Sequence, residues 1–232
     1  MALYINTNTA AQNAANSLAY SNTQLQISLN KLSSGSAIVN ASDNAGGLAA
    51  SMGLTAAAND SAAAVASDNN QISFLQAQDG VLKTAGDVAT RIAQLATLSS
   101  DPTMTMADKA GYTTESNTLQ TELGSLAGMK YNGQALFGAG TLDGVMLTNG
   151  DTIATIAASR ATNGARQSSL QFDSQANAST QTTEQAAAGQ ISNVDVASEA
   201  TNLAKFNVMV QYGAAMLAQA NQTTQVALKL IQ

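Results

Sequence analysis

The stretch TAAQNAANSLAYSNTQLQISLNKL, residues 9–32, decides the fold because its apolar side chains recur at helical spacing. Leu18, Leu25 and Leu32 are separated by seven residues, which is the spacing of a helix face that packs on another helix. The C-terminal part of the chain repeats the pattern at Leu203, Phe206, Val210, Gly213, Leu217 and Ala220. Two terminal helices with matching apolar stripes are therefore predicted.

These stripes are also the predicted assembly interface, because few charged residues flank them to keep a lone helix in water. A stripe of this kind most often packs within its own chain, and it can also meet a neighbouring molecule, so both interpretations stay open. The predicted interface residues are Leu18, Leu25, Leu32, Leu203, Phe206, Val210, Leu217 and Leu228. An assembling protein is therefore favoured over an enzyme.

Composition excludes several classes of function. The 232 residues include nine basic and fifteen acidic side chains, and the basic ones are scattered, so no clustered surface for nucleic acid is expected. No Cys or His is present, which removes disulfides, thiol nucleophiles and imidazole or thiolate metal sites. No cofactor or metal is expected, nor is a membrane span or a general secretory signal at the start.

The spacing of apolar residues, together with residues that end helices, divides the chain into predicted helices. Ser33, Ser34 and Gly35 end the first helix, and Pro102 ends the long second one because proline lacks a backbone donor. Turn residues between 38 and 47 predict a loop. The predicted helices span residues 9–32, 48–99, 106–127, 155–189 and 194–231. The fold class is mostly α, a long antiparallel helical bundle or coiled coil with a small β-hairpin patch.

The β-patch is predicted at about residues 130–156, where the apolar period changes. Asn-Gly and Asp-Gly dipeptides flank short apolar runs there, at Tyr131-Asn132-Gly133, Leu142-Asp143-Gly144 and Thr148-Asn149-Gly150. Such dipeptides favour tight hairpin turns. The expected organisation is an inner assembly domain, made of terminal helices in residues 1–40 and 194–232, and an outer helical domain, residues 41–193, which carries the patch.

Several dispersed motifs resemble bacterial flagellin. At the N-terminal end they are Ile5-Asn6-Thr7-Asn8, Leu32-Ser33-Ser34-Gly35 and Asp43-Asn44-Ala45-Gly46-Gly47-Leu48. At the C-terminal end they are Ile191-Ser192-Asn193-Val194-Asp195 and Leu217-Ala218-Gln219-Ala220-Asn221-Gln222. The resemblance covers nearly the whole chain and implies a short flagellin without the variable outer domains.

The resemblance implies a structural subunit that polymerises with itself into the flagellar filament, outside the cell, for motility. It further implies export without a cleaved signal peptide, through the filament channel, with a cytoplasmic chaperone, and contacts with hook-associated and cap proteins. The alternatives are a hook–filament junction protein, which shares the terminal pattern, and a secreted helical translocator or toxin. A zinc peptidase of the kind carried by some flagellins is excluded because the chain lacks His.

Two further interpretations concern individual side chains. In flagellins the segment that matches Arg91 and Leu95 touches the neighbouring subunit and an animal innate immune receptor, so these two residues are the candidate contact. The chain lacks charge at Ala93 and Gln94, which implies weakened receptor recognition. The carboxylates are dispersed, and those at helix boundaries, such as Asp43, Asp101 and Asp195, are expected to act as caps or turn residues rather than in catalysis.

Overall fold

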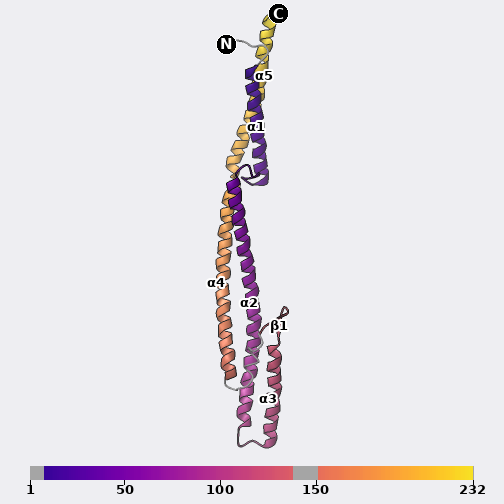
Figure 1. Cartoon of the computed structure of the whole chain (residues 1–232), viewed down its shortest axis with the longest axis vertical. Helices are drawn as coiled ribbons and strands as arrows, with labels where there is room; N and C mark the ends of the chain where they lie inside the picture. Colours follow the sequence, from indigo (N-terminus) through magenta and orange to yellow (C-terminus); the bar gives the residue numbers. More distant parts are fainter. Residues whose placement is uncertain (1–7, 138–150, 232) are drawn as a thin grey trace. The chain divides into compact units, whose positions relative to one another are not determined.

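The computed structural model describes residues 8–137 and 151–231 of the chain. These residues form five helices and one two-stranded antiparallel sheet, in the order α1, α2, α3, β1, β2, α4 and α5 (Figure 1). The mostly helical fold with a small β-patch is therefore confirmed. None of the described helices is both long enough and apolar enough to span a bilayer. By its contacts the chain divides into two compact units, one of residues 1–57 and 183–232 and one of residues 58–182.

Helix α1 spans Thr9–Ser34, close to the predicted 9–32. The side chain of Asn8 caps its start by accepting a hydrogen bond from the Ala11 N–H at 3.0 Å. Gly35 ends it in the left-handed region, with φ of +71°, as the sequence predicted. An L side chain at that position would be strained, so the glycine determines where the helix stops.

Helix α2 spans Ala45–Ser99, and so begins three residues before the predicted Leu48. The reason is local: the Asn44 side chain accepts a hydrogen bond from the Gly47 N–H at 2.8 Å and caps the first turn. The predicted loop is therefore wrong in its last residues. At the other end, the predicted stop before Pro102 is confirmed, and the Asp101 carboxylate accepts a hydrogen bond from the Thr103 N–H at 2.8 Å.

Helix α3 spans Met106–Ala127, the predicted bounds. It starts with a capping box: the Asp108 N–H donates to the Thr105 hydroxyl at 3.2 Å, and the Thr105 N–H donates to the Asp108 carboxylate at 3.3 Å. Both exchanges satisfy backbone donors that lack partners in the first turn.

The β-patch is one short hairpin in the described residues. Strands β1, Lys130–Tyr131, and β2, Gln134–Ala135, pair antiparallel across Asn132 and Gly133, whose φ values of +49° and +80° suit a two-residue turn. This confirms the hairpin predicted at Asn132-Gly133. The turns predicted around Asp143 and Asn149 lie outside the described residues.

Helix α4 spans Asp151–Ser192, and α5 spans Val196–Ile231. The start at Asp151 corrects the sequence interpretation, which placed residues 151–154 in the β-patch. The predicted bend between the last two helices is confirmed: backbone hydrogen bonds join Ala37 N–H to Ser192 C=O at 2.7 Å and Val194 N–H to Gly35 C=O at 3.0 Å. The end of α1 is thereby tied to the bend within the first unit.

The second unit has an apolar core contributed by α2, α3, α4 and the residues after β2. Its buried members are Leu82, Ala85, Ala89, Leu123, Leu126, Leu136, Phe137 and Ile156. Leu136 and Phe137 follow the hairpin directly, so burying them against the helices holds the patch in place.

Candidate assembly surfaces

Helices α1 and α5, which carry the two predicted stripes, pack along each other in the first unit (Figure 1). Leu18 lies against Gly213, where an added Cβ would be 3.2 Å from Leu18 Cδ1 and 3.5 Å from Leu18 Cα. Ser21 and Ser28 on α1 are buried, each 2% exposed. Small side chains at these positions let the two helix backbones come close together.

The predicted interface residues whose side chains the structure describes are all partly covered. The half-buried members are Leu18, Leu25, Leu32, Leu203, Phe206, Val210 and Leu217. Leu228 lies outside the residues whose side chains the structure describes. The stripes therefore serve at least as the contact between α1 and α5, and the remaining exposed part of each side chain is available to another molecule.

A second set of apolar side chains on α1 and α5 stays exposed beside this contact. Tyr212 is 70% exposed, Met216 62%, Met209 41% and Tyr20 60%. Met209, Tyr212 and Met216 border a groove of about 400 Å³ whose other lining residues are small or polar, and no charged residue lines it. Large apolar side chains that stay exposed together mark an interaction surface. We name Tyr20, Met209, Tyr212 and Met216 the outer set.

The outer set was missed by the sequence analysis, although a signal was present. Met209, Tyr212 and Met216 follow helical spacing of three and four, one position off the stripe through Val210, Gly213 and Leu217. Two adjacent apolar rows on one helix predict a helix covered on two sides rather than on one.

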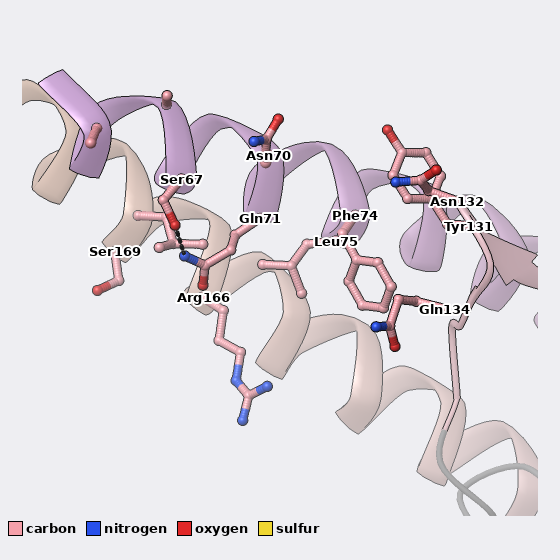
Figure 2. A pocket seen from close by; sticks show the side chains of 13 residues that line it. Ser67, Asn70, Gln71, Phe74, Leu75, Tyr131, Asn132, Gln134, Arg166 and Ser169 are labelled. Atoms are coloured by element: carbon pink, nitrogen blue, oxygen red, sulfur yellow. Dashed lines mark hydrogen bonds between the residues drawn. The ribbon is translucent and has the colours of Figure 1, made fainter.

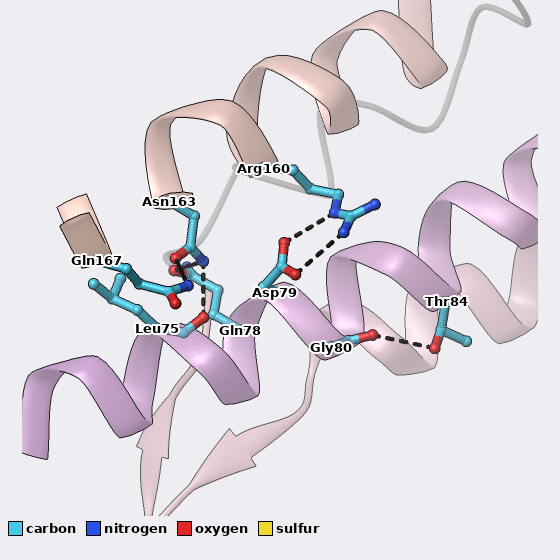
Figure 3. A network of polar contacts seen from close by, with 8 residues as sticks. All are labelled: Leu75, Gln78, Asp79, Gly80, Thr84, Arg160, Asn163 and Gln167. Carbon is cyan, nitrogen blue, oxygen red and sulfur yellow. Dashed lines mark hydrogen bonds and ion pairs between the residues drawn. The ribbon is translucent and has the colours of Figure 1, made fainter. Parts of the chain in front are cut away.

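The second unit contains a buried polar network between α2 and α4 (Figure 3). Asn163 is 3% exposed, and its amide donates to the Leu75 carbonyl at 3.0 Å and to the Gln78 side chain at 3.1 Å. Gln167 donates to the Asn163 side-chain oxygen at 2.8 Å. Gln78 in turn donates to the Leu136 carbonyl at 2.7 Å, so one network joins both helices to the residue after β2. Satisfied networks of this kind fix a unique alignment of helices.

An ion pair lies one helical turn along from this network (Figure 3). The Arg160 guanidinium donates to both Asp79 carboxylate oxygens, at 2.9 and 3.2 Å. This hydrogen bonding, assisted by the charge of Arg160, holds the pKa of the Asp79 carboxyl below its ordinary value, and it raises the pKa of Arg160. Both side chains are over a third exposed, so solvent limits what the pair contributes to stability.

The carboxylates at helix boundaries act as turn or cap residues, as predicted. Asp43 accepts hydrogen bonds from two backbone N–H groups, of Val39 and Asn40, and Asp195 accepts them from Ala197 and Ser198. Hydrogen bonds from the hydroxyl and backbone N–H of Thr103 lower the pKa of Asp101. Within the described ranges, no three carboxylates gather in a way that could hold a metal ion.

Comparison with protein families gives two matches that together span most of the chain. The bacterial flagellin N-terminal helical region matches residues 5–141, and the bacterial flagellin C-terminal helical region matches residues 147–231. The chain belongs to the bacterial flagellin family. Its function follows from this membership: it is a structural subunit of the flagellar filament.

Two of the relatives match this chain along nearly its full length, and a third matches over about half of it. The flagellar filament 33 kDa core protein of Treponema phagedenis is 28% identical over 286 aligned residues, which cover 99% of this chain and 100% of that protein. A flagellin of Halalkalibacterium halodurans is 27% identical, with 99% and 100% covered. Polar flagellin C of Vibrio parahaemolyticus is 35% identical over 127 residues, 55% of this chain and 33% of the relative.

Arg91 and Leu95, the candidate contact for a neighbour or an immune receptor, differ in exposure in the structure. Leu95 is 1% exposed, so its side chain belongs to the interior of the second unit. Arg91 is exposed and pairs with Glu115 of α3, with Arg91 Nη2 2.8 Å from Glu115 Oε1. Arg91 is therefore the accessible member of the two.

Proposed function

We propose that this flagellin family member polymerises with copies of itself, with residues 1–40 and 194–232 as the inner assembly domain and residues 41–193 as the outer one. The observation that carries the proposal is the outer set: large apolar side chains left exposed on a pair of terminal helices that bear almost no charge. Apolar surface of this kind is buried favourably against another molecule.

The charge distribution suits a second copy as that molecule. Between Lys205 and Lys229 the chain has no Asp, Glu, Lys or Arg, so two copies can bring this part of α5 together without like-charge repulsion. A contact between different patches on successive copies generates an open helical filament when the rotation between the copies does not close into a ring.

The eight predicted interface residues keep a role in this proposal. Those described in α1 and α5 pack the two helices together and thereby fix the position of the outer set. Their exposed remainder adds to the surface that a neighbour covers. Leu217 is half-buried and lies one residue from Met216 of the outer set, so it is placed to serve both contacts.

Further partners follow from the family resemblance. We propose that the chain is carried out through the filament channel with the help of an export chaperone that covers the C-terminal helix, and that the filament contacts hook-associated and cap proteins outside the cell. Recognition by an innate immune receptor is proposed to be weak, because Ala93 and Gln94 beside Arg91 carry no charge for charge-assisted hydrogen bonds. A reporter-cell assay with potency equal to a strongly stimulating flagellin would contradict this last point.

Negative-stain electron microscopy of the purified protein after salt-induced assembly tests the proposed polymerisation. Long filaments are the expected result. A protein that stays monomeric under all conditions would contradict the proposal and favour the hook–filament junction alternative. Leakage from lipid vesicles without filaments would favour the secreted toxin alternative instead.

A further inference from the structure

A shallow cleft of about 940 Å³ lies in the second unit, bounded by α2, α4 and the β1–β2 hairpin (Figure 2). Phe74, Leu75 and Leu170 supply its apolar surface, and amide and hydroxyl side chains form most of the rest. These amide and hydroxyl residues are Ser67, Asn70, Gln71, Asn132, Gln134 and Ser169. The polymerisation surface of the first unit does not include any of these residues.

The walls of the cleft are braced by contacts within the unit. The rings of Phe74 and Tyr131 meet edge to face with centroids 6.1 Å apart, which fastens the hairpin to α2. Gln71 donates to the Ser67 hydroxyl at 3.3 Å. Leu75 is 7% exposed and forms the floor, whereas Tyr131 is 41% exposed. The cleft is thus a preformed, open trough.

Arg166 is the one charged residue that lines this trough, and it lies on α4. It also lines an adjoining hollow of about 290 Å³, together with Leu75. Among the described residues the ion pairs engage Arg91 and Arg160, and no carboxylate lies within ion-pair distance of Arg166. Figure 2 shows its guanidinium extended from α4 with no dashed line to any other residue drawn. A guanidinium that has no partner and lies beside apolar surface can still form charge-assisted hydrogen bonds with a carboxylate.

We propose that this cleft receives a segment of a second copy of the chain that carries a single exposed carboxylate, and that this carboxylate pairs with Arg166. The inference rests on the proposed polymerisation, and it adds a contact made by the second unit. Fifteen acidic residues against nine basic ones mean that each copy presents excess carboxylates, and Glu122 and Asp173 are exposed examples in the second unit. Electrostatic complementarity then sets the register of one copy on the next.

The shape of the cleft favours a macromolecular occupant over a small molecule. Sites for small molecules enclose most of the ligand surface. Here nearly all lining side chains are exposed and only Leu75 is buried, so a small molecule would stay largely in solvent. A trough with apolar side chains along its length and a polar rim instead suits a helix or an extended segment.

Charge reversal at Arg166 tests the contact. Arg166→Glu is expected to raise the protein concentration needed for filament assembly at least about tenfold, because it replaces an attraction by a repulsion. Lys83→Glu, an exposed site on α2 outside the cleft, makes the same change in net charge and is expected to assemble as the unchanged chain does. The unfolding temperature of Arg166→Glu should match that of the unchanged chain, because Arg166 has no partner to lose in the monomer.

Each outcome separates the two proposals. Assembly of Arg166→Glu at the concentration of the unchanged chain, or equal impairment by Lys83→Glu, overturns the cleft contact and leaves the proposed polymerisation standing. If the unchanged chain forms no filaments, both proposals fail. A compensating reversal, Glu122→Arg or Asp173→Arg in the Arg166→Glu background, that restores assembly would identify the carboxylate.

A second measurement reports directly on what covers the cleft. The chain has no cysteine, so Ser169→Cys places a single thiol on the exposed wall. A maleimide reagent is expected to modify that thiol quickly in the monomer and at least about tenfold more slowly in filaments, where a second copy covers it. Equal rates in monomer and filament would overturn the proposal.

Discussion

Replacing Gly213 with valine tests whether close packing of α1 on α5 is required for assembly. A Cβ at this position would lie 3.2 Å from Leu18 Cδ1, 3.4 Å from Leu18 Cβ and 3.5 Å from Leu18 Cα. The Leu18 methyl group can rotate away, but its Cα cannot, and the two γ-methyl groups of valine extend further than Cβ. Gly213→Val should therefore push the two helices apart.

The size of the effect follows from two opposing contributions. Overpacking of this kind costs about 1–3 kcal/mol. Valine favours a helix over glycine by about 0.4 kcal/mol, which offsets a small part of that cost. A net loss of about 0.6–2.6 kcal/mol in every subunit corresponds to a protein concentration for assembly that is about threefold to eightyfold higher.

Sedimentation of filaments at a series of protein concentrations measures this change, and hydrogen exchange of the monomer shows whether α1 and α5 have separated. Gly164→Val on α4 is the matched control, because a Cβ there meets no atom within 4 Å. Normal assembly of Gly213→Val, with exchange protection in α1 and α5 unchanged, would refute the reasoning.

Three further predictions concern the apolar stripe of α5, the polar network around Asn163 and the ion pair between Asp79 and Arg160. Leu217→Asp should abolish filaments because it places an unpaired carboxylate in a packed contact, while the second unit unfolds normally; normal filaments would show that this stripe is not needed for assembly. Asn163→Ala should lower the free energy of unfolding by about 2–3 kcal/mol through three lost hydrogen bonds, whereas the exposed Asn70→Ala should change it by less than about 0.5 kcal/mol, both measured by urea denaturation. Asp79→Asn should lower the free energy of unfolding at neutral pH, and its difference from the unchanged chain should vanish in acid. The reason is that folding lowers the pKa of Asp79: the resulting stabilisation is fully present at pH values above the ordinary carboxyl pKa and is lost as the pH falls through the lowered pKa. A constant difference between the two unfolding curves from pH 7 to strong acid would contradict the pKa shift of Asp79.

Helix ends were predicted well where one residue determines the backbone. Gly35 with its positive φ and Pro102 with its missing donor act within a single turn, so their effect can be read from the sequence. The starts of α2 and α4 were predicted too late, because Asn44 and Asp151 suit either a turn or a helix start. Which of the two forms depends on the packing of the helix that follows, and a local pattern does not contain that information.

Contacts between distant residues could not be predicted from one sequence. The amide of Asn163 meets a backbone carbonyl of α2 that lies 88 residues earlier in the chain. Periodicity showed that helices pair but not at which register, so it gave no reason to single out this asparagine. The resemblance to flagellin likewise named Leu95 as a candidate contact, whereas packing in the second unit leaves its side chain 1% exposed.

The distribution of side-chain size on α1 and α5 links folding of the first unit to assembly. An ordinary pair of helices buries its large side chains at the contact, yet here Gly213, Ser21 and Ser28 lie inside while Tyr20 and Tyr212 stay exposed. The small internal residues bury little apolar area, so pairing of the two helices alone gains little free energy.

Covering the outer set changes that balance. Full burial of a large apolar side chain such as Met216 contributes about 1.5–3 kcal/mol. A neighbour that covers several members of the outer set therefore adds at least as much stabilising free energy as one residue of the α1 or α5 stripe does within the chain. Part of this gain offsets the entropy lost when α1 and α5 become fixed. The terminal helices are therefore expected to gain most of their stability on entering the filament, which agrees with a subunit whose terminal segments complete their packing only among copies of itself.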